Sequence, residues 1–277
     1  MWQVACGMEA EPLFPTCDIP PTTYILLDTI LRMKPSRSNY RIVLVRPRNP
    51  LNIGAAARAM ANFGLHEMVV VAPYPPVWQE TRSAVGAEKV VRAARAVDAL
   101  PEAIGDRTWV VGTTSGSRRN LDRDLIPLNE TKVWLPQRVR RGRVALLFGS
   151  EKTGLSNDEM SFCHALVRIS TAERCPSMNL GHAVAVCCYE MAREGAISNR
   201  PLGTKTHHSD PANFQSIDHV FARAERVLDE VGFLKPKSRA ATLIKLRRLL
   251  IDLDLTNNDV KILGGILAQI EWKLGNN

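Results

Sequence analysis

The stretch from Val144 to Met191 constrains the fold more than any other part of the chain. It opens with five consecutive apolar residues, Val-Ala-Leu-Leu-Phe, which predict a strand buried on both faces. A polar loop bracketed by Gly149 and Gly154 follows, and two glycines at this spacing favour a tight turn or a close approach to a ligand. Ser156, with Glu159 three residues later, has the capping-box pattern that opens a helix.

The same order of elements is then repeated. The apolar run Ala165–Ile169 predicts a second buried strand, and apolar side chains at helical spacing from Leu180 to Met191 predict a second helix. Strands that alternate with helices in this way predict a parallel α/β sheet. Both polar loops should then leave the carboxyl edge of that sheet, where α/β folds bind ligands. We therefore expect a ligand site at this edge.

The residues before this stretch continue the α/β pattern. A turn containing Asn, Pro and Gly at 49–54 leads into an alanine-rich segment that predicts a helix packed closely on a sheet. A small polar loop at 112–119 follows another apolar run and could cradle a ligand or be a plain turn. The predicted elements are strands at 41–46, 68–72 and 108–111, a helix at 55–63 ending at Gly64, and helical segments within 80–105 with Val85 on their buried side.

Basic residues gather around the predicted site. Arg58 lies one turn into the helix at 55–63, where it either faces solvent or points to the ligand edge to hold a phosphate bidentately. Four arginines between Gln137 and Arg143 form either a solvated loop or a phosphate-contact patch. The net charge of +8 and the pI of about 9.4 favour a polyanionic partner.

The pattern changes after Glu194. Residues 195–212 mix Gly, Pro, Ser, Asn, Thr and His without a period, which predicts a linker. Apolar residues at helical spacing then predict a helix at 214–231, a basic segment at 235–253 with a buried face that includes Leu253, and a last helix capped by Thr256 and Asp259. The apolar residues of the last helix are Ile262, Leu263, Ile266, Leu267, Ile270 and Leu274. This part is either an RNA-binding module or a dimerisation element.

Several common classes of protein are excluded by missing motifs. The chain has no Walker-type phosphate loop and no GxSxG, HExxH or GxGxxG sequence. Its six cysteines form no CxxC pair and have no zinc-ligand spacing, so we expect reduced thiols and a cytoplasmic protein. No apolar run has the length of a membrane span, so no membrane association is expected.

Three segments, taken together and in order, resemble a known family. Asn52–Met60, Leu147–Ser156 and Ser177–Val184 resemble the three motifs of the SpoU branch of the SPOUT RNA 2′-O-ribose methyltransferases, and among these the TrmJ type. The resemblance covers residues 40–274. It implies an α/β parallel-sheet SPOUT fold with a C-terminal trefoil knot, plus a small all-α C-terminal domain. It also implies S-adenosylmethionine as the cofactor, tRNA as the substrate and a homodimer.

The resemblance also implies the roles of individual residues. Five match the catalytic positions of the motifs, namely Arg58, Ser177, Asn179, Asn52 and Glu151. The positions that contact the cofactor are matched by Thr113, Thr114, Ser115, Gly149, Ile169, Pro176, Ser177 and Met178. No metal is expected. The chain departs from the TrmJ type at Cys175–Asn179, where those enzymes tend to have Tyr-Ser-Ser-Leu-Asn; Pro176 lacks an N–H, so its backbone cannot donate a hydrogen bond to the cofactor.

The resulting domain division is a flexible N-terminal extension at 1–39, a methyltransferase domain at 40–195, a linker at 196–212 and a helical C-terminal domain at 213–277. The implied function is 2′-O-methylation of tRNA by S-adenosylmethionine, at a cytidine or uridine in anticodon-loop position 32. Two alternatives stay open. The same chemistry could act on ribosomal RNA or another tRNA site, or the chain could be a non-catalytic RNA-binding protein with the same fold.

Overall fold

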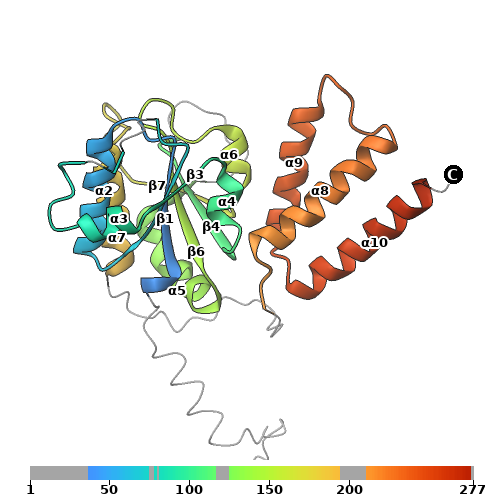
Figure 1. Ribbon diagram of the computed structural model, residues 1–277, viewed down its shortest axis with the longest axis horizontal. Helices are drawn as coiled ribbons and strands as arrows, with labels where there is room; N and C mark the ends of the chain where they lie inside the picture. Colours follow the sequence, from blue (N-terminus) through green and yellow to red (C-terminus); the bar gives the residue numbers. More distant parts are fainter. Residues whose placement is uncertain (1–36, 75–77, 80, 117–124, 194–209, 276–277) are drawn as a thin grey trace, which may run out of the picture. The chain divides into compact units, whose positions relative to one another are not determined.

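A computed structural model describes residues 37–74, 78–79, 81–116, 125–193 and 210–275. Within these residues, seven parallel strands form one sheet in the order β3-β2-β1-β6-β4-β7-β5 (Figure 1). The strands are β1 (Tyr40–Val45), β2 (Glu67–Val71), β3 (Arg95–Val97), β4 (Trp109–Thr113), β5 (Leu125–Pro127), β6 (Val144–Phe148) and β7 (Ala165–Arg168). The strand predicted at 144–148 is confirmed as β6, which lies between β1 and β4 in the sheet and is buried throughout.

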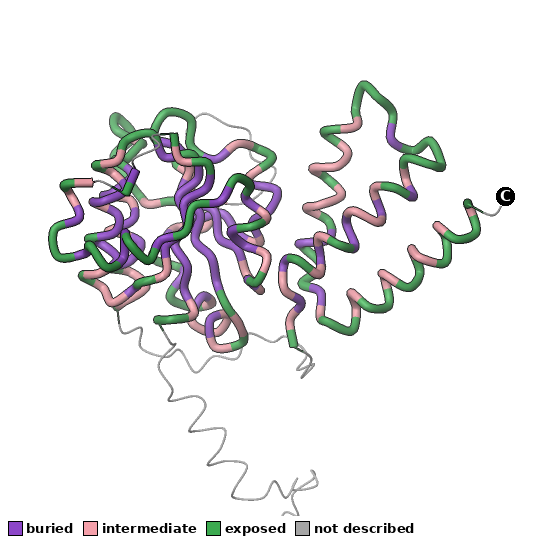
Figure 2. Tube along the Cα trace, in the orientation of Figure 1, coloured by how far each residue is buried: buried purple, intermediate pink, exposed green. Residues whose placement is uncertain are grey.

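Helices cover both faces of this sheet. Neighbouring residues of a strand point to opposite faces, and in β1 both sets are apolar and buried. Ile42 and Leu44 pack with residues of α2 (Pro50–Asn62), α3 (Glu88–Ala93), α5 (Thr131–Arg141) and α7 (Leu180–Ala192). Val43 and Val45 pack in a second cluster with residues of α4 (Leu100–Ile104), α6 (Asn157–Ser161), α8 (Phe214–Glu230) and α9 (Arg239–Asp252). Figure 2 shows the strands as the buried centre between these layers. A parallel sheet buried on both faces is therefore confirmed, whereas the trefoil knot stays a prediction.

The C-terminal part is helical, as predicted. It consists of α8 (Phe214–Glu230), α9 (Arg239–Asp252) and α10 (Asn257–Gly275). The predicted cap of the last helix is present, because the Asp259 carboxylate accepts from the Thr256 N–H at 2.9 Å and the Thr256 hydroxyl accepts from the Asp259 N–H at 3.2 Å. No helix among the described residues is long and apolar enough to cross a membrane.

Two predictions about element boundaries are wrong. The helix predicted at 55–63 begins at Pro50, because the Asn49 side chain accepts from the Leu51 N–H at 2.9 Å and proline suits the first helical position. Arg58 therefore lies about two turns inside α2, not one. The segment Gln137–Arg143 is not the solvated loop that was one of its two interpretations, because it belongs to α5 as far as Arg141, whereas its role as a phosphate-contact patch stays a prediction.

Three predictions are also wrong, namely the helical pattern through 80–105, the burial of Val85 and the burial of Leu253. Within 80–105, Arg95–Val97 form β3, an edge strand too short to show a period in sequence, and Val85 is exposed. Leu253 is 54% exposed. In α10 the side chains of Ile262, Ile266 and Ile270 are exposed, because the helix uses Val260, Leu263 and Leu267 to pack on the core.

Two short 3-10 helices complete the described elements, η1 (Arg37–Asn39) and η2 (Leu128–Glu130). Most of the predicted N-terminal extension, the end of the loop at 112–119 and most of the predicted linker lie outside the described residues. The division of the chain into an extension, a methyltransferase domain, a linker and a helical domain stays a prediction.

Candidate active site

The residues expected to contact the cofactor follow three adjacent strands. Thr113–Ser115 lie at the end of β4, Gly149 follows β6, and Ile169 follows β7. Because the sheet order is β6-β4-β7 and all three strands are parallel, their carboxyl ends meet at one edge. The Thr113 hydroxyl donates to the Leu147 carbonyl at 2.8 Å, which ties the end of β4 to β6.

The loop at 149–154 folds back on itself at this edge. The Gly154 N–H donates to the Ser150 carbonyl at 2.7 Å, and Gly154 has a φ of 65°, which favours glycine. A Cβ atom at Gly149 would lie 2.1 Å from the Gly154 carbonyl carbon and from the Leu155 nitrogen. The two glycines therefore permit a turn so tight that backbone lies directly on backbone, as their spacing predicted.

The Glu151 carboxylate accepts hydrogen bonds from the beginning of α2. The N–H of Arg48 donates to Oε2 at 2.9 Å, while the N–H of Asn49 and Nδ2 of Asn52 donate to Oε1 at 3.1 and 2.8 Å. Burial acts to raise the pKa of Glu151, but the hydrogen bonds from Asn52, Arg48 and Asn49 outweigh it and lower the pKa below its ordinary value of 4.5. The carboxylate is therefore held ionised.

Asn179 extends this contact to α7. Its Nδ2 donates to the Asn52 Oδ1 at 2.9 Å, and its own Oδ1 accepts from the N–H of Gly181 at 2.9 Å and of His182 at 3.3 Å, which caps the helix. The two helices approach closely here, since a Cβ on Gly181 would lie 2.7 Å from that of Ala55. We call Asn179, Asn52 and Glu151 the amide relay.

The orientation of both amides in the relay is determined by chemistry. An ionised carboxylate only accepts hydrogen bonds, so Asn52 must present its NH₂ group to Glu151 and its oxygen to Asn179. Asn179 must then present its NH₂ group to Asn52 and its oxygen to the N–H groups of α7. One chain of donors and acceptors thus connects the three sequence motifs.

The other two expected catalytic residues are not brought into contact with the relay. Arg58 is exposed on α2, and no partner for its side chain occurs within the described ranges. Ser177 is exposed in the loop before α7, next to Met178, which is 37% exposed. The same loop is held by the Thr171 hydroxyl, which donates to the Pro176 carbonyl at 3.2 Å.

Sequence reasoning missed two features of this edge. The backbone N–H groups of Arg48 and Asn49 bind Glu151, although nothing in a sequence marks a backbone donor. Arg46 forms an ion pair with Glu159 at 2.8 Å, so Glu159 both caps α6 and binds the end of β1. The capping pattern identified the first role of Glu159 and gave no signal for the second.

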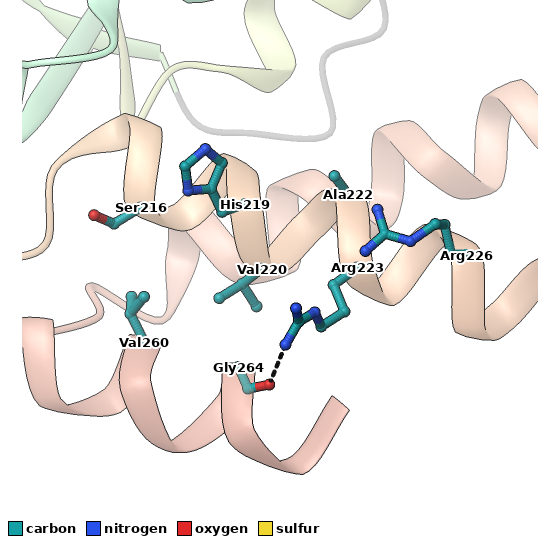
Figure 3. A pocket seen from close by; sticks show the side chains of 8 residues that line it. All are labelled: Ser216, His219, Val220, Ala222, Arg223, Arg226, Val260 and Gly264. Atoms are coloured by element: carbon teal, nitrogen blue, oxygen red, sulfur yellow. Dashed lines mark hydrogen bonds between the residues drawn. The ribbon is translucent and has the colours of Figure 1, made fainter. Parts of the chain in front are cut away.

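A cavity of about 400 Å³ lies elsewhere, between α8 and α10 (Figure 3). Arg223 extends across it and donates to the Gly264 carbonyl at 3.0 Å. Glu271 forms ion pairs with both Arg223 and Arg226, at 3.1 and 3.0 Å, so much of the positive charge is already balanced. We therefore assign this cavity to helix packing and keep the carboxyl edge of the sheet as the candidate active site.

Comparison with known proteins identifies the family. The sequence profile of the SpoU rRNA Methylase family matches residues 39–189, and that of the TrmJ tRNA methyltransferase C-terminal domain matches residues 215–277. The sheet, its edge site and these matches define the class: the chain belongs to the SpoU methylase family, and its particular relatives there are the TrmJ methyltransferases. The resemblance inferred from the three motifs is confirmed.

Individual relatives match over most of their length. The tRNA (cytidine/uridine/adenosine-2′-O-)-methyltransferase TrmJ of Pseudomonas aeruginosa is 34% identical over 83% of this chain and 93% of that protein. The tRNA (cytidine/uridine-2′-O-)-methyltransferase TrmJ of Pectobacterium atrosepticum is 33% identical over 84% of this chain and 97% of that protein. The crystal structure of TrmJ from Z. mobilis ZM4 superposes with a TM-score of 0.72 at 28% identity, covering 83% of this chain and 98% of that one.

Proposed function

We propose that this protein transfers a methyl group from S-adenosylmethionine to the ribose 2′-hydroxyl of a cytidine or uridine in tRNA, at position 32 of the anticodon loop. The observation that carries the proposal is the amide relay, which joins the three motifs of a SpoU methylase at the carboxyl edge of the sheet. The names of the TrmJ relatives support tRNA as the substrate and the ribose oxygen as the acceptor.

The residues at this edge fit a nucleoside-type cofactor. The ends of β4, β6 and β7 present backbone groups and the hydroxyls of Thr113–Ser115, while Ile169 and Met178 supply apolar surface. Gly149, Pro176 and Ser177 would complete the contacts. S-adenosylmethionine supplies a methyl group that its sulfonium charge has already activated. A ligand with an adenine ring and a ribose needs such a mixture of backbone hydrogen-bonding groups and apolar side chains.

The protein must then align and activate the 2′-hydroxyl, which is a weak nucleophile. We assign this role to Arg58, whose guanidinium would bind the adjacent phosphate and lower the pKa of the hydroxyl. Because an arginine stays protonated at neutral pH, Arg58 would activate the hydroxyl electrostatically. The hydroxyl proton would pass to water as the oxygen–methyl bond forms and the carbon–sulfur bond of the sulfonium breaks. The amide relay would hold α2 and α7 in place, and Ser177 would position the ribose and phosphate.

We also infer a homodimer that works in the cytoplasm, where its substrate tRNA is found. The helical part at 213–277 would serve RNA binding or dimerisation. Its exposed basic residues include Lys235, Lys237 and Lys245. Sedimentation of the full chain at several concentrations tests the dimer, and a mass that stays monomeric would contradict it.

The function is tested by incubating the purified protein with S-adenosylmethionine and unmodified total tRNA, and by analysing the digested nucleosides by mass spectrometry. New 2′-O-methylcytidine or 2′-O-methyluridine is expected, and mapping then locates the site. Cofactor binding without tRNA methylation would move the search to ribosomal RNA. A protein that binds RNA but neither binds the cofactor nor transfers a methyl group would be a non-catalytic RNA-binding protein.

A further inference from the structure

Two neighbouring strands end in an unusual backbone conformation beside the amide relay. Arg46 after β1 and Ala72 after β2 have φ values of 51° and 44°, in the left-handed region that non-glycine residues seldom adopt. Each conformation is retained by a backbone bond to the next strand, from the N–H of Arg46 to Val71 and from that of Ala72 to Val97, both at 2.8 Å. Such strain is often retained at functional sites.

The two turns bring an arginine and a tyrosine together. The Tyr74 N–H donates to the Pro47 carbonyl at 3.2 Å, so the chain after β2 is tied to the chain after β1. The guanidinium carbon of Arg48 lies 5.3 Å from the centre of the Tyr74 ring, within the range of a cation–π contact. Tyr74 is nevertheless 74% exposed, so its ring contributes little to the core.

This pair is linked directly to the active site. The backbone N–H of Arg48 is one of the donors to the Glu151 carboxylate, and the next residue, Asn49, supplies another. The side chain of Arg48 therefore extends from a backbone that the amide relay holds. Unpaired RNA bases stack on exposed aromatic rings and on arginine guanidinium groups, and this pair offers both beside the candidate site.

We propose that Tyr74 and Arg48 form a stacking platform for an unpaired base next to the nucleotide whose ribose is methylated. This inference rests on the proposed function and adds a contact that the reacting ribose does not make. The platform recognises a single-stranded segment by the face of a base and by the adjacent backbone charge. It would therefore select for a loop over a duplex and tolerate different bases.

The test compares Tyr74→Leu with Tyr74→Phe in the full-length protein. Leucine keeps apolar volume but loses the ring, and phenylalanine keeps the ring. With an unmodified anticodon stem-loop as substrate, Tyr74→Leu should raise KM about tenfold, within the range measured for loss of one base stack, and should change KM far more than kcat. Tyr74→Phe should recover most of the affinity. Cofactor affinity and melting temperature of Tyr74→Leu should stay at their wild-type values.

A matched control is a second exposed tyrosine–arginine pair among the described residues. Tyr189 on α7 is 53% exposed, and the Arg193 guanidinium carbon lies 5.9 Å from its ring centre. Tyr189→Leu should leave KM unchanged. An equal rise in KM for both leucine variants, an unchanged KM in Tyr74→Leu, or a rise matched by lost cofactor affinity would each overturn the platform.

Binding is measured separately from turnover, with 2-aminopurine placed beside the target nucleotide of the same RNA. Wild type should quench its fluorescence, and Tyr74→Leu should quench it less at saturating protein. If wild type transfers no methyl group, the proposed function fails while this quenching still reports on stacking. If wild type is active and its quenching equals that of Tyr74→Leu, only the platform is wrong.

Discussion

At the scale of single residues, the geometry of the candidate site depends on which atoms donate hydrogen bonds and which accept them. The Glu151 carboxylate determines the orientation of Asn52, and Asn52 in turn determines that of Asn179. The three motif residues were identified in sequence, but their hydrogen bonds to one another could not be, because they are separated by 99 and 127 residues. Arg58 stands apart, exposed on α2, and so is free to meet a substrate.

Replacing Arg58 tests electrostatic activation. Arg58→Ala should lower kcat about 100-fold or more, because removing one group that stabilises transition-state charge has effects of this size. Arg58→Lys keeps the charge without the planar fork and should recover only part of the rate. Methyl transfer to tRNA is measured under saturating cofactor. Arg92→Ala, on the exposed side of α3, is the control. Full turnover with normal RNA binding in Arg58→Ala would refute the assignment.

Glu151 should make the stability of the site depend on pH. Its pKa is lower in the folded protein than the ordinary 4.5, so its stabilising effect is present above pH 4.5 and lost as the pH falls through the folded-state pKa. Glu151→Gln should therefore lower the melting temperature at pH 7, and the gap to wild type should narrow in acid. Thermal unfolding between pH 3 and pH 7 measures this, and a gap that is independent of pH would contradict it.

At the scale of elements, local patterns identified strands and helices well where the pattern was long. β6, the capped start of α6 and the helix α7 were all predicted, because apolar runs and capping boxes are local signals. The start of α2 was placed too late, since Asn49 and Pro50 are compatible with both a turn and a helix cap. The three-residue strand β3 was missed because only its pairing with β2 defines it.

The loop after β6 should tolerate no side chain at its first glycine. Gly149→Ala should destabilise the fold by about 1–3 kcal/mol, the usual effect of overpacking, because its Cβ would meet backbone that cannot rotate away. Gly154→Ala is the matched control, since its Cβ would meet nothing within 4 Å and only the positive φ is strained, at about 1 kcal/mol. Denaturant unfolding measures the free energy of unfolding of both variants. Equal losses in Gly149→Ala and Gly154→Ala would mean that the structure shifts to relieve the clash at position 149.

At the scale of the whole described molecule, a charged cluster at the opposite edge connects the sheet to the C-terminal helices. Asp106 binds Arg41 at 2.7 Å and Arg107 at 2.5 Å, while Arg107 is 2% exposed. The residues on either side of Asp106 hold the first turn of α8, because the carbonyls of Gly105 and Arg107 accept from the N–H groups of Gln215 and Phe214, each at 2.8 Å.

Removing the charge of Asp106 should weaken this connection. Burial would raise the pKa of Asp106, but hydrogen bonds and charges from Arg107 and Arg41 hold it well below its ordinary value of 3.8. The stabilisation is thus present above pH 3.8 and lost as the pH falls through the folded-state pKa. Asp106→Asn should cost about 1–2 kcal/mol at pH 7, a value reduced for solvent screening because the side chain is 44% exposed.

The measurement is thermal unfolding at pH 7 and pH 3, with exposed Asp98→Asn as the matched control. The loss in Asp106→Asn should be smaller at pH 3 than at pH 7, because the unfolded wild-type carboxylate is then largely protonated while the folded one stays ionised. Asp98→Asn should match wild type at both pH values. Identical melting temperatures for the two variants at pH 7 would show that the cluster adds no stability.

Sequence was enough to predict most of the elements and the family, because apolar period, caps and ordered motifs are properties of neighbouring residues. Only the tertiary structure decided which groups meet there. The amide relay, the Arg48–Tyr74 pair and the Asp106 cluster all join residues that are distant along the chain. Such contacts depend on strand order and on how closely helices approach one another, and neither property can be predicted from a local segment of sequence.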